Sequence, residues 1–143
     1  MKIKTLLYVS LIFLIGCTTK QKQLKEIDPS TYWGKNPWPE IRKKRINKLL
    51  PNALQEAKVD CWLVLCRENN NDPLADHIGG ENTGGSAVFL FYNDDRGFHS
   101  KVFSPIGEST ALDELNIHDE VVSVPRGNST IDLAINFIKN KNF

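Results

Sequence analysis

The chain has 143 residues, of which 41% are hydrophobic and 24% are charged, and this composition excludes a disordered or collagen-like protein. Its 18 basic and 17 acidic side chains nearly cancel, so charge gives no support to nucleic-acid binding. Three cysteines are too few for a disulfide-dense scaffold, and the length suits one ordinary domain.

The first residues have the pattern of a secretory signal. Lys2 and Lys4 precede an apolar run over residues 6–15, which is too short to span a bilayer comfortably. The letters LIGC at residues 14–17 resemble a bacterial lipobox, in which the cysteine becomes the lipidated first residue of the mature protein. An ordinary signal peptide or a short membrane helix with an incidental cysteine is the plainer alternative.

This pattern predicts a lipoprotein signal peptide over residues 1–16, a lipid-anchored tether over residues 17–37 and a folded domain over residues 38–143. Lipidation of Cys17 makes the membrane the expected partner of the anchor, because more than one acyl chain gives a stable attachment. The expected location is the bacterial cell envelope, reached by secretion across the inner membrane.

Charge is distributed unevenly along the predicted mature chain. Residues 20–48 hold nine cations and three anions, whereas residues 49–143 hold seven cations and fourteen anions. A solvated helix face beside the tether is the favoured interpretation, and a docking patch for an acidic partner is the alternative.

The folded part has the pattern of one α/β domain. Residues 32–39 are rich in aromatic residues and proline, and we expect no helix at the prolines. Apolar spacing predicts a helix over residues 40–57 that is kinked or restarted at Pro51. The continuous apolar run over residues 59–66 predicts a strand buried on both faces.

The remaining elements alternate between strands and helices. A polar stretch over residues 67–85 precedes a buried strand, and the turn that follows is typical of a hairpin. The expected elements are a strand over 86–92, a turn over 93–97, a strand over 98–103, a helix over 108–115, a strand over 120–124 and a helix from Ser129. The last helix is expected to pack its Ile131, Ala134, Ile135 and Ile138 on the sheet.

Few residues form a pattern typical of catalysis. Cys61 and Cys66 lie five residues apart on one predicted strand, about 16 Å apart, which excludes a disulfide between them and favours buried structural thiols. His77 lies near three carboxylates, those of Asp72, Asp76 and Glu81, but this spacing is weak evidence for a metal. The glycine pairs at residues 79–80 and 84–85 lack the lysine of a phosphate loop.

The polar residues that follow the first strand form the best candidate site. Arg67, Glu68, Asn71 and Asp72 come directly after a buried strand, where ligands tend to bind in α/β sheets. The favoured alternative is loop stabilisation, in which these side chains bond to nearby backbone or to one another.

The run over residues 38–92 resembles the N-terminal domain of the creatinase/prolidase superfamily, and specifically of secreted Xaa-Pro aminopeptidase-like proteins (M24 metallopeptidases). Three features support the resemblance: the basic helix over 40–48, the strand that ends in Arg67-Glu68, and the loop from NDPL at 71–74 to GGEN at 79–82. The resemblance implies a mixed β-sheet flanked by helices, placed before a separate metallopeptidase domain.

In complete family enzymes that second domain holds two divalent metal ions through two aspartates, one histidine and two glutamates. We recognise no such domain here, so the resemblance assigns no catalytic residue, metal ligand or cofactor to this chain and implies that it is inactive alone. It also implies that the domain is truncated at its C-terminal end, beyond Phe143.

Two alternative functions are compatible with the sequence and with this resemblance. The first is a non-catalytic N-terminal domain that serves subunit association or substrate access in a complete enzyme, with a homo-oligomer or a separately encoded catalytic domain as partner. The second is a self-standing lipid-anchored module that binds a small ligand or a protein. Its expected binding loop comprises Arg67, Glu68, Asn71, Asp72, His77, Glu81 and Asn82.

Overall fold

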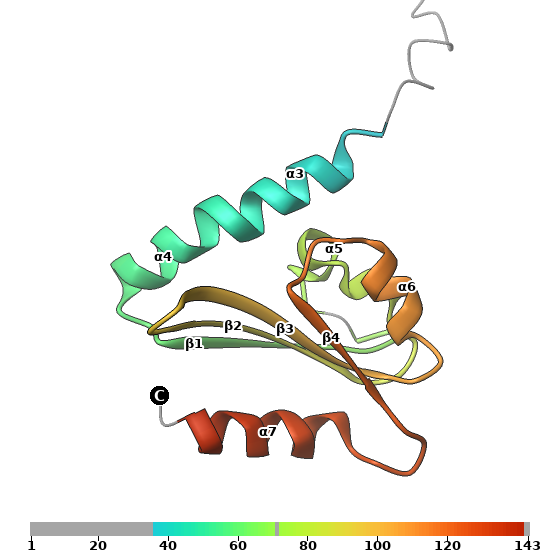
Figure 1. The fold of residues 1–143 in the computed structure, drawn as a ribbon. Coiled ribbons are helices and arrows are strands. Elements are labelled where there is room, and N and C mark those ends of the chain that lie inside the picture. The colour runs from blue at the N-terminus through green and yellow to red at the C-terminus, as the bar shows by residue number, and fades with distance from the viewer. Residues whose placement is uncertain (1–35, 71, 142–143) are drawn as a thin grey trace, which may run out of the picture. The chain divides into compact units, whose positions relative to one another are not determined.

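The computed structural model describes residues 36–70 and 72–141, which form an α/β domain with a four-stranded mixed sheet between two helical layers (Figure 1). The predicted fold class is therefore confirmed. In chain order the elements are α3 (Trp38–Lys44), η1 (Arg45–Leu49), α4 (Leu50–Ala57), β1 (Cys61–Cys66), α5 (Ala75–Ile78), η2 (Gly80–Asn82), β2 (Ala87–Asp94), β3 (Gly97–Pro105), α6 (Ser109–Glu114), β4 (Glu120–Val124) and α7 (Thr130–Lys141). Among residues 36–70 and 72–141, none of the helices combines the length and the hydropathy of a transmembrane span.

The first helical segment is continuous from Trp38 to Ala57, with a π-helical stretch, η1, between two α-helical parts. A π-turn widens the helix and lets the segment pass Pro51 without ending, which confirms the predicted distortion at this proline. The expectation that Pro39 is non-helical is wrong. Pro39 lies in the first turn of α3, where its missing N–H has no helical partner to lose.

The sheet has the order β1-β2-β3-β4. The first three strands are antiparallel and β4 runs parallel to β3, with α6 as the crossover. The predicted hairpin turn is present between β2 and β3, and Gly97 supplies the positive φ of 114° that the turn requires. The strands β2 and β4 match their predicted ranges closely, because their apolar runs are bounded by clear turn residues.

The strand β1 lies at an edge, which corrects the prediction that it is buried on both faces. Its Val64 and Cys66 are buried, but Leu63 is 43% and Leu65 40% exposed. The apolar run alone could not show which face another element covers.

Each face of the sheet carries its own core. Above the sheet, the helices of residues 38–57, α5 and α6 pack around Phe89 and Phe91, and below it α7 packs on Leu90 and Tyr92 (Figure 1). The predicted contact face of α7 is partly wrong. Ala134 is buried, and Phe137 packs against Phe103 and Tyr92, while Ile131 and Ile135 are 38% and 39% exposed.

Candidate functional site

Arg42 fixes the loop between β1 and β2 to the first helix. Its Nε donates a hydrogen bond to the backbone oxygen of Asp76 at 2.8 Å, and its Nη2 forms an ion pair with Glu81. The Arg42 residue is only 6% exposed, and its guanidinium lies 5.1 Å from the ring centroid of Trp38. Because Arg42 is buried and binds both the backbone and a carboxylate of the loop, it acts as a structural clamp.

A second contact joins the same two elements at the surface. Arg45 Nη1 lies 2.6 Å from His77 Nδ1, and both groups pack on Trp38, whose ring is 5.8 Å from the imidazole and 5.5 Å from the guanidinium. The spacing of Trp38, Arg42 and Arg45 is i, i+4 and i+7, which places them on one face of a helix. This helical spacing was the only sequence signal for the cluster.

An apolar pocket of about 250 Å³ opens beside the Arg45–His77 pair. Its wall on the helix side is apolar, its floor is Trp62 of β1, and its far side comes from α5. The lining residues are Arg45, Ile46, Leu49, Leu50, Ala53, Trp62, Leu74, His77 and Ile78. Leu49 is 63% exposed and Leu74 39%, so apolar side chains reach solvent at the mouth. Such a surface favours an apolar group from a binding partner.

The predicted binding loop is only partly assembled at this pocket. Of its residues, His77 lines the pocket, and Glu81 supports it through Arg42. The Asp72 carboxylate accepts a hydrogen bond from the Leu74 N–H at 2.8 Å, and Asn82 Nδ2 donates to the Gly79 oxygen at 3.2 Å. Both side chains therefore stabilise the loop, and for Asp72 this is the loop-stabilising role that the alternative interpretation predicted.

The other predicted residues lie elsewhere. Arg67 and Glu68 follow the end of β1 and do not line the pocket, and the Glu68 N–H donates to the Gly84 oxygen at 3.2 Å. Asn71 and Cys17 lie outside the described residues. The loop contains the short helices α5 and η2, which its high polarity and glycine content concealed.

Acidic, histidine and cysteine side chains do not converge into a metal-binding group within residues 36–70 and 72–141. Both cysteines in this part of the chain are free thiols. Burial raises the pKa of Cys66 to about 11 and also raises the pKa of Cys61, so both favour the unreactive thiol form.

His118 supports the pocket from behind. Its Nε2 lies 2.8 Å from the backbone oxygen of Ile78, to which the neutral ring donates, and its Nδ1 is buried without a partner among the described residues. The ring packs against Phe89 and Phe91, with centroids 5.4 Å and 6.1 Å away. Burial lowers the pKa of His118 to about 4, against weaker opposing effects of the Ile78 oxygen and Asp119.

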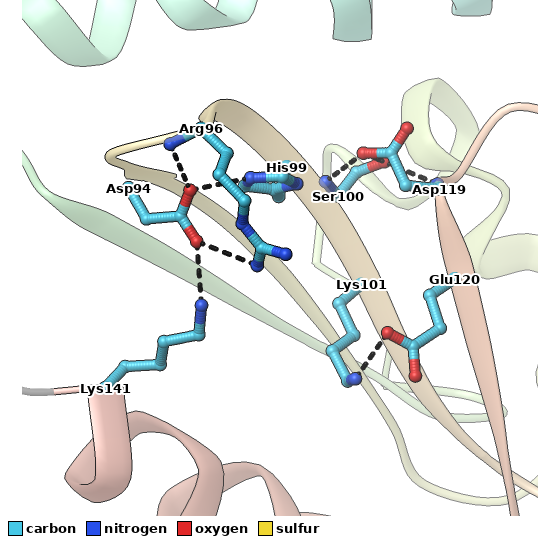
Figure 2. Close-up of polar contacts among 8 residues, drawn as sticks. All are labelled: Asp94, Arg96, His99, Ser100, Lys101, Asp119, Glu120 and Lys141. Atoms are coloured by element: carbon cyan, nitrogen blue, oxygen red, sulfur yellow. Dashed lines mark hydrogen bonds and ion pairs between the residues drawn. The ribbon is translucent and has the colours of Figure 1, made fainter.

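A separate polar cluster joins the β2–β3 turn to the end of α7 (Figure 2). The Asp94 carboxylate accepts from Lys141 Nζ at 2.7 Å and from the Arg96 N–H at 2.9 Å, and it contacts His99 Nε2 at 2.8 Å. These contacts, with that of Lys141 the largest, hold the pKa of Asp94 well below its usual range. These contacts between opposite charges connect the β2–β3 turn to the end of α7.

The same view shows two further contacts between β3 and the start of β4. The Ser100 N–H donates to the Asp119 carboxylate at 2.7 Å, and Lys101 Nζ lies 2.5 Å from Glu120 Oε2 (Figure 2).

Comparison with known proteins gave no match: no protein-family model, no curated protein and no solved structure matches this chain. The apolar pocket is consequently the feature on which an interpretation of function depends.

Proposed function

We propose that this chain is a non-catalytic, lipid-anchored domain of the bacterial cell envelope, of the Xaa-Pro aminopeptidase-like type, that holds a partner protein at the apolar pocket. The observation that carries the proposal is the open pocket between the first helix and α5. Its volume of about 250 Å³ lies below the roughly 300–1,000 Å³ of sites for small-molecule ligands. This size suits one or two apolar side chains of another protein.

The charge of the helix that forms the pocket wall indicates the chemistry of the partner. Its exposed basic side chains are Arg45, which lines the pocket, and Lys43, Lys44 and Lys48, and its exposed acidic side chains are Glu40 and Glu56. An acidic protein surface that presents an apolar side chain complements both properties. The basic residues at 42–48 therefore serve two purposes: Arg42 clamps the loop, and the exposed cations attract the partner.

The resemblance to creatinase/prolidase N-terminal domains supports a specific partner, a metallopeptidase domain that acts on Xaa-Pro peptides. In that arrangement the two metal ions and the catalytic residues belong to the partner. The role of this chain is subunit association or control of access to the catalytic site, and lipidation at Cys17 holds the assembly at the membrane.

A binding experiment with matched variants tests the proposal. The full chain, purified in detergent, is titrated by calorimetry with the Xaa-Pro metallopeptidase domain of the same bacterium. Leu49→Asp places a charge at the pocket mouth, and Ile106→Asp places one at a comparably exposed site away from the pocket; the two residues are 63% and 52% exposed. We expect Leu49→Asp to weaken binding about tenfold, which corresponds to about 1.4 kcal/mol, and Ile106→Asp to leave it unchanged.

Two results would overturn the proposal. Equal binding by both variants would show that the pocket is not the contact site, and no binding by the parent chain would exclude this partner. Hydrolysis of Xaa-Pro peptides by the chain alone with added Mn²⁺ would contradict a non-catalytic role.

A further inference from the structure

The lower side of β1 and one flank of α7 carry exposed aliphatic residues, which together are called the apolar patch. Cys61 of β1 packs in the core below the sheet, so Leu63 and Leu65 point to the same side by strand alternation. Ile131 and Ile135 lie on the flank of α7 away from Phe137, whose ring contacts Phe103 and Tyr92 with centroids 5.9 Å and 5.5 Å away. These four aliphatic residues are 38–43% exposed.

The outer edge of β1 also offers backbone groups for pairing. The Asn93 N–H donates to the Asp60 oxygen at 3.2 Å, and hydrogen-bonded pairs alternate along antiparallel strands. Leu63 and Leu65 consequently direct their N–H and C=O groups away from β2, where no strand of the described chain pairs with them. Cys61–Cys66 contains no charge, proline or glycine, which are the usual protections of an edge strand.

We propose that β1 pairs with β1 of a second copy of this chain and joins the two sheets into one of eight strands. A two-fold axis perpendicular to the sheet makes the two edge strands antiparallel and keeps each face of one sheet level with the same face of the other. Both copies then place their exposed leucines on the same side, so that the two patches meet beside the axis. The proposal does not depend on the metallopeptidase partner.

The residues with outward-facing backbone groups select the register of this pairing. An axis at Leu63 sets Cys61, Leu63 and Leu65 opposite Leu65, Leu63 and Cys61 of the other copy, so every outward-facing residue of β1 has a partner within the strand. An axis at Val64 would instead set Cys61 opposite Arg67, which lies beyond the end of β1. The register centred on Leu63 therefore combines the longest backbone pairing with a Leu63–Leu63 contact on the axis.

Disulfide trapping tests both the pairing and its register. Opposed residues of a hydrogen-bonded antiparallel pair have Cα atoms about 5.5 Å apart, within the range that a disulfide spans. The full chain with Leu63→Cys is expressed in bacterial membranes, oxidised mildly and examined on non-reducing gels. Ile135→Cys is the matched control, since it adds an equally exposed cysteine to the same patch away from the strand edge.

We expect Leu63→Cys to give about tenfold more disulfide-linked homodimer than either Ile135→Cys or the parent chain with its native cysteines. Adding Leu65→Lys should abolish the product, because a lysine on the patch opposes edge pairing, while circular dichroism shows the fold retained. Absence of the homodimer, equal cross-linking by Ile135→Cys, or a mixed disulfide with a different protein would each overturn the proposal.

Discussion

Acidification from pH 7 to pH 4 should destabilise the domain through His118. The folded protein lowers the pKa of His118 to about 4, whereas an unfolded chain has a histidine pKa of about 6.5. The unfolded state therefore binds the proton first, and stability falls as the pH drops below about 6.5. The difference of about 2.5 pKa units, at about 1.4 kcal/mol each, corresponds to about 3 kcal/mol of lost stability once the pH reaches 4.

A loss of this size is large, because small domains unfold with only about 5–15 kcal/mol. Urea unfolding of the full chain at pH 7, 5.5 and 4 measures it. His118→Gln is the comparison, since its amide keeps a donor for the Ile78 oxygen but does not titrate. We expect the free energy of unfolding to fall between pH 7 and 4 by about 3 kcal/mol more in the parent than in the variant.

If the free energy of unfolding of the parent and of His118→Gln decreased in parallel with pH, the prediction would be wrong, because the buried ring would then not cause the loss of stability. Asp94 does not obscure the result. Both proteins contain this carboxyl group, so its protonation in the unfolded state near pH 4 contributes equally to the two profiles.

Three other predictions follow from particular contacts. Replacing Arg42 by Met should cost about 2–3 kcal/mol in urea unfolding, and Glu81→Gln should cost less, because Glu81 is 35% exposed and screened by solvent; equal costs would contradict the clamp. Cys17→Ser should abolish acyl mass and partitioning into detergent, and equal partitioning of both forms would exclude a lipid anchor. Asp94→Asn should lower the melting temperature at pH 7 and lower it less at pH 2, since the stabilisation from the lowered pKa of Asp94 decreases as the pH falls below 3.8; a pH-independent difference would contradict the role of Lys141.

Most of the architecture could be predicted because its signals are local. The apolar runs of β2 and β4 are bounded by turn residues, and Ser129 caps α7 through a hydrogen bond from the Asp132 N–H at 3.1 Å. The π-helical turn before Pro51 was foreseen as a distortion, since proline removes a donor from a helix whose apolar phase continues.

The errors arose where burial depends on elements distant in sequence. An apolar strand is the same string of residues at an edge as in the centre of a sheet, so β1 was assigned two buried faces. In α7 the apolar spacing predicts that Ile131 and Ile135 are buried against the sheet. Phe137 packs against Phe103 and Tyr92 instead, and Ile131 and Ile135 are partly exposed. The pocket was missed for the same reason, since its walls come from residues 45–53, Trp62 and residues 74–78.

The two proposed interactions use opposite sides of the sheet but meet at β1. Trp62 forms the floor of the pocket above, and its neighbour Leu63 belongs to the patch below. Pairing centred on Leu63 sets Val64 of the second copy opposite Trp62, so a dimer would close the pocket floor on its outer side. The dimer should therefore present two pockets on one face, and a partner that engages both would gain affinity by multivalency without a new contact.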